Sequence, residues 1–332
     1  MKNLFRTMMS IFIIISIILI PIDVSALSIE NTNNSDSAIL ELLADCGNTN
    51  SVRFKKPLYN SNEEIIANLY FLNPNGYAVV SLQDVIIEFS LTQDFCSQTT
   101  SRLYYTGPMS FYIKEGGKYF DLKTDAEISK PTIDKCELEL NQKIELSNSV
   151  TQYQTSSVSP RAEIIDSDYT ISYVPTAYQS TNNTCGPIAC AIFLKYYDDH
   201  INSNILNAVH NTSSGTALMN YFQNLIDVNE DGCSYVDVVN GLNYHMSNRG
   251  LTTYNATSAI DCAFSLYKTT VERNRPTIVG VTGHAVYGEH WVVGYGYFIS
   301  NPATYVIVND GWGSNGIRIN YNFTDGMVYL NK

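Results

Sequence analysis

Cys185 is the residue whose type and setting best suit covalent chemistry. Gly186 and Pro187 follow it, and proline favours the first turn of a helix, where its missing N–H group is not needed. A thiol at a helix N-terminus faces exposed N–H groups and the positive end of the helix dipole. Both stabilise a thiolate and lower the thiol pKa from about 8.5. The sequence therefore predicts a nucleophile at Cys185, with a small buried thiol that caps the helix as the alternative.

Gln179 stands six residues before Cys185. Its side-chain amide can donate a hydrogen bond to the oxyanion that forms after a thiolate attacks a carbonyl group, and the backbone N–H of Cys185 would be the second donor. We therefore expect Gln179 to complete an oxyanion hole. An ordinary surface glutamine is the alternative.

A catalytic thiolate needs an imidazole that holds the ion pair and later protonates the leaving amine. Three of the five histidines stand on or beside expected helices without a supporting pattern, and we expect them to face solvent: His200, His210 and His245. The other two, His284 and His290, lie near expected strands. We favour His290 because it opens a strand that runs directly into residues 294–297, and His284 remains the alternate.

Two polar residues, Asn309 and Asp310, end the next expected strand and are followed by Gly-Trp-Gly. Either side chain can orient the imidazole. Asp310 would also stabilise the imidazolium by its charge, whereas Asn309 could act only through a hydrogen bond. Trp312 could shield that bond from water. We expect Asp310 to be the third catalytic residue, with Asn309 as the alternate.

The order cysteine, histidine, aspartate, with a glutamine six residues before the cysteine, resembles the papain-like cysteine peptidases. Residues 290–296 and 305–313 are similar to the His strand and the Asn-Ser-Trp-Gly strand of papain, and on this register Asp310 falls where papain has its asparagine. The compact Gln…Asn-x-Cys-Gly-Pro form is closer to the bacterial C39-like and streptopain-type peptidases. Gly-Pro replaces the tryptophan that follows papain's cysteine, so the resemblance does not imply papain's substrate cleft.

The resemblance covers residues 170–332, and a second one lies earlier in the chain. Residues 69–81, which include Gly-Tyr-Ala-Val-Val-Ser, and the strand-like residues 86–90 look like the pro-domain of streptopain-type zymogens. This resemblance implies a propeptide that inhibits the enzyme and assists its folding, and that is removed within residues 147–165. An accessory β domain that stays attached is the alternative.

Hydrophobic periodicity gives the elements that must position these residues. In the first part of the chain, residues 64–81 predict a hairpin that turns at residues 73–76, and further strands are expected through residue 123. Beyond residue 171 the pattern predicts helices first and strands last. The expected fold class is α+β: a papain-like peptidase domain with helices followed by an antiparallel sheet, preceded by a mostly β pro-domain.

The first 26 residues have the three parts of a secretory signal: Lys2 and Arg6, an apolar run, and an end at Ala26. The apolar run is shorter than the roughly 20 residues that a spanning helix needs. An uncleaved membrane anchor is the alternative. We expect a signal peptide over residues 1–26, a pro-domain over 27–146, a linker with the processing site over 147–165 and the peptidase domain over 166–332. The protein is expected to be secreted, with no membrane span after signal cleavage.

Composition narrows the function classes. A net charge of −12 without any basic cluster argues against nucleic acid or an anionic membrane as a partner. The seven cysteines are an odd number, which leaves at least one thiol unpaired within the chain. Residues 227–232 match the first half of a calcium-binding loop, but Val238 stands where a bidentate glutamate is needed, so a helix-capping loop is favoured. We expect no metal and no cofactor.

Together these features predict a secreted cysteine endopeptidase made as a zymogen. Its substrate would be a protein or peptide, and its own pro-domain would be an intramolecular inhibitor. Two alternatives stay open: an amidase or acyltransferase that acts on cell-wall peptides, and an inactive secreted binding protein on the same scaffold.

Overall fold

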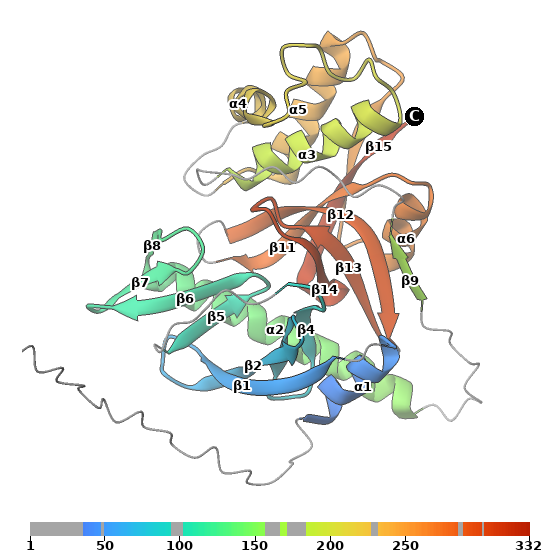
Figure 1. The fold of residues 1–332 in the computed structure, drawn as a ribbon. Coiled ribbons are helices and arrows are strands. Elements are labelled where there is room, and N and C mark those ends of the chain that lie inside the picture. The colour runs from blue at the N-terminus through green and yellow to red at the C-terminus, as the bar shows by residue number, and fades with distance from the viewer. Residues whose placement is uncertain are drawn as a thin grey trace, which may run out of the picture. The chain divides into compact units, whose positions relative to one another are not determined.

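The computed structural model describes residues 36–47, 50–93, 102–156, 167–170, 184–226, 232–284, 288–300 and 302–332. Residues 34–332 form one compact unit. Within it, α3, α4 and α5 gather at one end, the strands β1 to β4 lie at the other, and β11 to β14 lie between them (Figure 1). We refer to residues 36–156 as the N-terminal half and to residues 167–332 as the C-terminal half.

The N-terminal half is mostly β, as predicted. Its elements are α1 (Ser37–Asp45), β1 (Ser51–Tyr59), β2 (Ile65–Asn73), β3 (Tyr77–Ser81), β4 (Ile86–Ser90), β5 (Leu103–Gly107), β6 (Ser110–Glu115), β7 (Lys118–Asp121), β8 (Glu127–Ile128) and α2 (Lys130–Ser156). The predicted hairpin is β2 and β3, which pair antiparallel with Phe71 opposite Tyr77. Gly76 has a φ of +117°, and a side chain there would collide with the carbonyl oxygen of Ser90.

The C-terminal half has its helices before most of its strands, and the predicted α+β class is confirmed. Its elements are β9 (Ser167–Thr170), α3 (Cys185–His200), α4 (Thr216–Leu225), α5 (Tyr235–Asn248), β10 (Asn255–Ile260), α6 (Phe264–Glu272), β11 (Thr277–His284), β12 (Gly288–Ser300), β13 (Ala303–Asn309), β14 (Asn315–Asn320), the 3-10 helix η2 (Tyr321–Phe323) and β15 (Thr324–Asn331). Ser234 starts α5 with a capping box, since its hydroxyl and Asp237 satisfy each other's backbone N–H groups.

One 15-stranded sheet runs through both halves in the order β10-β15-β11-β12-β13-β14-β4-β3-β2-β1-β5-β6-β7-β8, with β9 added beside β12. The halves are joined where β14 pairs with β4, at Arg318 opposite Phe89 and Ile319 opposite Glu88. Asn320 strengthens this junction by donating a 3.0 Å hydrogen bond to the carbonyl oxygen of Ile86. We call the β4–β14 pairing the seam.

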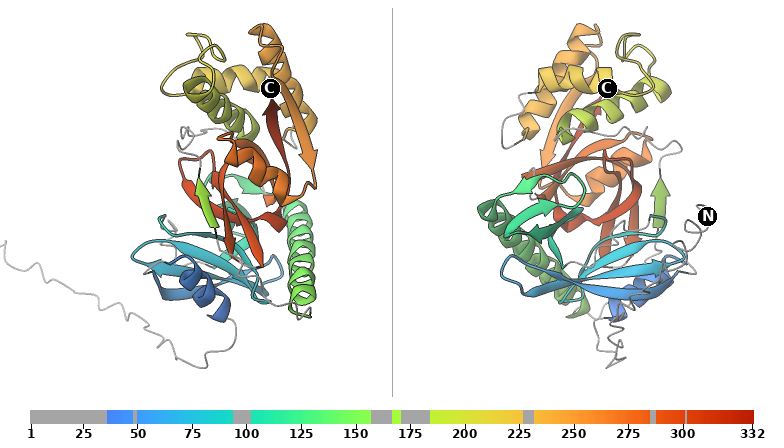
Figure 2. Two further views of the ribbon diagram at one scale, coloured as in Figure 1. Left: turned by 90° about the vertical axis from the view of Figure 1, so that its right-hand side faces the viewer. Right: turned by 60° about the vertical axis from the view of Figure 1, so that its left-hand side comes forward.

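Residues 147–156 were expected to be linker because serine, threonine, glutamine and asparagine dominate them, but they form the last turns of α2. Packing accounts for the difference, since tertiary contacts override weak helix propensity. The helix contacts β5, β11 and η2 and runs along both halves (Figures 1 and 2). Lys143 binds Asp325 at 3.1 Å, and Ser147 accepts a 3.1 Å hydrogen bond from Asn322. Residues 157–165 of the expected linker lie outside the described part of the chain.

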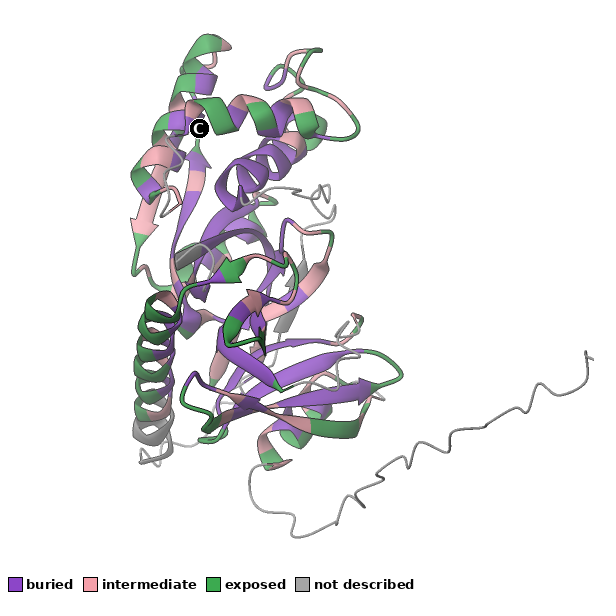
Figure 3. Cartoon of the chain, turned by 90° about the vertical axis from the view of Figure 1, so that its left-hand side faces the viewer, coloured by how far each residue is buried: buried purple, intermediate pink, exposed green. Residues whose placement is uncertain are grey.

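Buried side chains fill the space between the elements in both halves. Strands β3 and β4 and most of α3 are buried, whereas the outer face of α2 is exposed (Figure 3). A separate small cluster of tyrosines and isoleucines holds β5 to β8 against the start of α2. Among the described residues, no helix is long and apolar enough to cross a membrane.

Candidate active site

Cys185 is the first residue of α3, as the sequence predicted, and only 5% of it is exposed. Thr184 occupies the N-cap position, and its carbonyl oxygen accepts a 3.0 Å hydrogen bond from the N–H of Ile188. The backbone N–H groups of the first turn are not used by the hydrogen bonds of the helix itself; here they are those of Cys185 and Gly186, because Pro187 has none. A thiol at this position lies at the positive end of the helix dipole, which favours a thiolate.

Two glycines show how closely the first turn of α3 approaches the other candidate residues. A methyl group on Gly186 would lie 3.5 Å from Cδ1 of Trp291, the residue after His290. A methyl group on Gly311, the residue after Asp310, would lie 3.0 Å from Cγ2 of Ile188. The turn that starts at Cys185 thus packs against the chain neighbours of both predicted partners. Residues far apart in sequence converge on one place.

His290 lies on β12 and is completely buried. Its Nε2 donates a hydrogen bond of 3.2 Å to the backbone carbonyl oxygen of Asp310. Because a carbonyl oxygen can only accept, this bond holds the proton of the neutral imidazole on Nε2. Nδ1 is then the basic nitrogen, the one able to take a proton from a thiol.

Trp312 covers the imidazole of His290. The two rings are stacked, with centroids 4.0 Å apart and an angle of 6° between their planes. The second candidate, His284, ends β11 and is 1% exposed, with its ring centroid 5.0 Å from that of His290. The two buried imidazoles and the half-buried Trp312 form one aromatic cluster that limits the access of water to the imidazole of His290.

The side chains of Asn309 and Asp310 build the turn that follows β13. Oδ1 of Asn309 accepts from the N–H of Gly311 at 2.9 Å. Oδ1 of Asp310 accepts from the N–H groups of Trp312 and Ser314, at 2.8 and 2.9 Å. The 3.2 Å hydrogen bond between His290 and Asp310 is made by the backbone carbonyl group of Asp310, whereas the prediction assigned this role to the carboxylate. Asp310 therefore contacts the imidazole of His290, but through its backbone carbonyl oxygen and not through its side chain.

The N-terminal half reaches the site from β5 and from the turn after β7. The ammonium group of Lys123 binds the carboxylate of Asp310 and lies 4.8 Å from the ring centroid of Trp312. Gly107 packs against the backbone just before His284, so closely that a methyl group there would lie 2.9 Å from the carbonyl oxygen of Thr282. Sequence patterns gave no sign of Lys123, because 187 positions separate it from Asp310.

Electrostatics keep both imidazoles neutral in the full-length chain. Burial lowers the pKa of His290 well below 6.5, and the charges of His284 and Lys123 lower it further, against the opposing effect of the bond to Asp310. Burial also lowers the pKa of His284 to about 4, although the charge of Asp121 opposes this. An imidazolium that could pair with a thiolate is therefore disfavoured while the N-terminal half covers the site.

The remaining predicted features fall elsewhere. Gln179, the segment 227–231 and the signal-like residues 1–26 lie outside the described residues. The expectation that His245 faces solvent is wrong: it is 1% exposed, and its Nε2 donates to the carbonyl oxygen of Ile205 at 2.9 Å. Burial lowers the pKa of His245 to about 4. The prediction rested on the lack of a supporting pattern, whereas the structure places this ring between α5 and the loop after α3.

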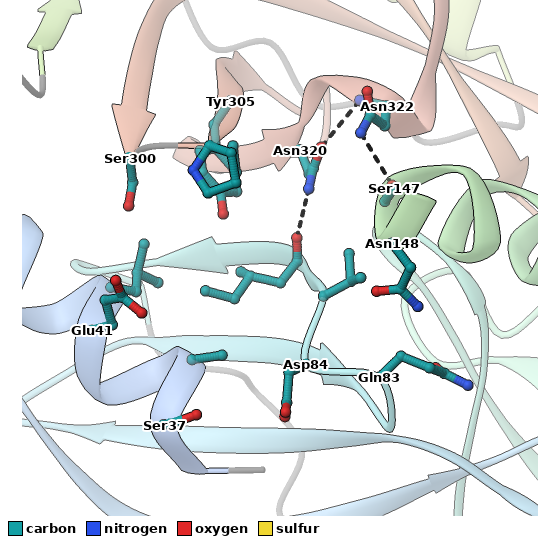
Figure 4. A pocket seen from close by; sticks show the side chains of 16 residues that line it. Ser37, Glu41, Gln83, Asp84, Ser147, Asn148, Ser300, Tyr305, Asn320 and Asn322 are labelled. Carbon is teal, nitrogen blue, oxygen red and sulfur yellow. Dashed lines mark hydrogen bonds between the residues drawn. The ribbon is translucent and has the colours of Figure 1, made fainter. Parts of the chain in front are cut away.

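A cavity of about 280 Å³ lies at the seam, and none of the candidate catalytic residues is among those that line it (Figure 4). Its lining comes from both halves and includes Glu41, Asp84, Ser147 and Tyr305. One wall is fixed by Asn320, which reaches across to the backbone of Ile86. The cavity marks where the two halves meet.

Residues 171–330 match the model of the Peptidase_C39 like family. No curated protein matches the chain. Among solved structures, a fragment of prointerpain A from Prevotella intermedia is similar, with 12% sequence identity and a TM-score of 0.44 over 84% of this chain and 98% of that chain. The matched segment holds Cys185, His290 and Asp310. Residues 171–330 are therefore similar to the Peptidase_C39 like family, and this match supports a papain-like cysteine peptidase.

Proposed function

We propose that this protein is a secreted cysteine endopeptidase made as a zymogen. The observation that carries the proposal is the packing of the turn that begins at Cys185 against the residues directly after His290 and Asp310. A nucleophile at a helix N-terminus and a buried imidazole with a fixed tautomer are what thiol-based acyl transfer requires.

In the proposed reaction, Nδ1 of His290 accepts the thiol proton and the thiolate of Cys185 attacks the carbonyl carbon of a peptide bond. The oxyanion is stabilised by the backbone N–H of Cys185 and, in our proposal, by the amide of Gln179. His290 then protonates the leaving amine as the C–N bond breaks, which leaves a thioester. Water that loses a proton to His290 hydrolyses the thioester and restores the thiol.

The zymogen part of the proposal rests on the contacts of the N-terminal half. Lys123 and Gly107 pack against the histidine side of the site, and burial lowers the pKa of His290, with smaller contributions from the charges of His284 and Lys123. Removal of residues 27–156 would uncover the imidazole and take this positive charge away. The signal-like residues 1–26 support export, after which the N-terminal half would serve as an intramolecular inhibitor.

Hydrolysis of casein by the processed protein tests the function. We expect Cys185→Ala to lose hydrolysis by at least about a thousandfold, while Cys262→Ser, at a half-buried thiol far along the chain, keeps it. Casein hydrolysis by Cys185→Ala at the rate of the unchanged protein would contradict the proposal. Release of amino acids from purified cell wall without any cleavage of casein would replace it with an amidase acting on cell-wall peptides.

A further inference from the structure

Lys123 places a cation in a buried site beside the catalytic imidazole. Its ammonium group binds Oδ2 of Asp310, and 39% of the lysine side chain is exposed, whereas the side chain of Asp310 is completely buried. The ammonium also lies 4.8 Å from the ring centroid of Trp312. The half-exposed lysine side chain thus places its charge near a carboxylate and an aromatic ring. Both the ion pair and the cation–π contact stabilise a cation at this position.

Several hydrogen bonds to Asp121 stabilise the turn that carries Lys123. Oδ1 of the buried Asp121 accepts from the N–H groups of Lys123 and Thr124, at 3.0 and 2.8 Å, and from the hydroxyl of Thr124 at 2.9 Å. The N–H of Asp125 closes the turn on the carbonyl oxygen of Asp121 at 3.0 Å. The lysine is therefore presented by a fixed backbone.

Asp310 depends on that cation. Its Oδ1 already accepts from the N–H groups of Trp312 and Ser314, and its Oδ2 binds the ammonium group of Lys123. In the full-length chain Asp310 is completely buried, so without Lys123 its charge would be neither hydrated nor paired. When the N-terminal half leaves, Oδ2 of Asp310 becomes a place that a new cation would stabilise.

Because Trp312 stacks on His290, the position of this cation site along a bound peptide can be inferred. The imidazole stacks on the Trp312 indole at a centroid distance of 4.0 Å, and the ammonium group of Lys123 lies 4.8 Å from the centroid of the same side chain, so the cation lies beside the imidazole. In a thiol peptidase the imidazole protonates the leaving amine, and it therefore stands on the side of the peptide that leaves first. A side chain seated over Trp312 belongs to that leaving segment.

We propose that Asp310 and Trp312 form a subsite for a lysine or arginine side chain of the substrate, on the leaving-group side of the cleaved bond, and that Lys123 occupies this subsite in the full-length chain. The inference rests on the proposed peptidase function and adds a substrate class to it. It also gives the N-terminal half a specific means of inhibition, because its lysine mimics the substrate side chain.

Matched peptides test the subsite on the processed protein. One series carries lysine, acetyl-lysine, arginine or glutamate at the first position after the cleaved bond, and a second series carries them at the next position. In one of the two series, lysine and arginine should exceed acetyl-lysine in kcat/KM by at least about tenfold, with glutamate slower still. The preference should shrink as salt is raised. Equal rates for lysine and acetyl-lysine in both series would overturn the inference and leave the peptidase standing, whereas no cleavage of any peptide would overturn the peptidase.

A binding readout tests the same subsite without catalysis. In full-length Lys123→Ala, n-butylammonium should raise the unfolding temperature more than n-butanol does, because it supplies a cation with an alkyl stem to the vacated position. Full-length Lys123→Arg and the unchanged chain are the controls, and neither should respond. Equal effects of the amine and the alcohol on Lys123→Ala would contradict a cation-binding site. If Lys123→Ala does not fold, the peptide series decides.

Discussion

At the scale of single residues, the two buried histidines differ in what they touch. His290 is held by the carbonyl oxygen of Asp310 and covered by Trp312, and its strand neighbour meets the turn of Cys185. His284 lies behind it, at 5.0 Å between ring centroids. The contacts therefore favour His290 as the acid and base of the reaction and leave His284 as part of its surroundings.

Replacement of each histidine separates these roles. His290→Ala should lower kcat of the processed protein by a factor of about 10² to 10⁴, the range that general acid–base catalysis contributes. His284→Asn should lower kcat by less than about tenfold, because it removes a packing partner of the imidazole and not the proton carrier. Steady-state kinetics on one peptide substrate measures both. A larger loss from His284→Asn than from His290→Ala would reverse the assignment.

The sequence was sufficient for the residues that carry local signals. Cys185 is marked by the Gly-Pro that starts a helix, and His290 by the strand that it opens. The atom of Asp310 that meets His290 could not be predicted, because the choice between backbone and side chain depends on the turn that Asp310 itself builds with Trp312 and Ser314. The ion pair between Lys123 and Asp310 could not be predicted from the sequence, because it forms only when distant segments of the chain pack together.

At the scale of elements, the start of α3 depends on the absence of a side chain at Gly186. A methyl group there would lie 2.2 Å from Sγ of Cys233 and 3.5 Å from Trp291. Alanine normally stabilises a helix relative to glycine by roughly 0.5–1 kcal/mol. At this position we expect the collision with the sulfur to outweigh that gain.

Gly186→Ala should therefore lower the free energy of unfolding of the full-length chain by roughly 1–3 kcal/mol, the usual cost of overpacking. Adding Cys233→Ala should restore most of the loss, since Cβ of Cys233 lies at an ordinary 3.8 Å from the added methyl group. Urea unfolding of the two single variants and the double variant measures the coupling. A double variant no more stable than Gly186→Ala would show that the sulfur is not the obstacle.

Helix α2 shows where composition misleads. Its last turns are rich in polar residues that favour loops in isolation, yet Lys143 and Ser147 anchor the preceding turns to Asp325 and Asn322. A hydrophobic pattern alone could not reveal these polar contacts, which add to the burial of Leu140 and Ile144. The predicted processing region is therefore helical over residues 147–156.

A regular helix resists proteases, which need an extended chain, so cleavage should fall beyond Ser156. We expect the first residue of the mature protein to lie between positions 158 and 167. N-terminal sequencing of the processed protein measures this directly. A mature N-terminus between positions 147 and 156 would mean that α2 opens before the cut.

At the scale of the whole molecule, the seam that joins the two halves contains a buried carboxyl group. Glu88 on β4 is completely buried and faces the N–H of Met109, at 3.1 Å, and the hydroxyl groups of Tyr105 and Tyr77. Burial raises the pKa of Glu88 to about 7, although these hydrogen bonds and the charge of Lys123 oppose the shift. The seam is therefore sensitive to pH in the neutral range.

The sign of this effect follows from proton binding. Between pH 4.5 and about 7 the folded chain keeps the proton of Glu88 while the unfolded chain releases it, so the contribution of Glu88 to the free energy of unfolding falls as the pH rises through this window. The total change is roughly 3 kcal/mol as an upper bound. Above about pH 7 the contribution of Glu88 to the free energy of unfolding no longer changes with pH.

Glu88→Gln removes this titration and keeps the shape of the side chain. Relative to the unchanged full-length chain, the variant should gain stability from pH 5 to pH 8, by up to roughly 3 kcal/mol in the free energy of unfolding. The comparison cancels the contributions of His284 and His290, which both chains share. Parallel stability curves across this range would show that Glu88 does not titrate there.

The central claim is that Cys185 is the reactive thiol of a peptidase. Mass spectrometry of the processed protein after brief treatment with iodoacetamide at neutral pH tests it most directly, because it identifies each modified cysteine. We expect rapid modification of Cys185, with none at Cys190, whose complete burial raises the pKa of its thiol. Slow modification of Cys185, no faster than that of the half-buried Cys262, would contradict the claim.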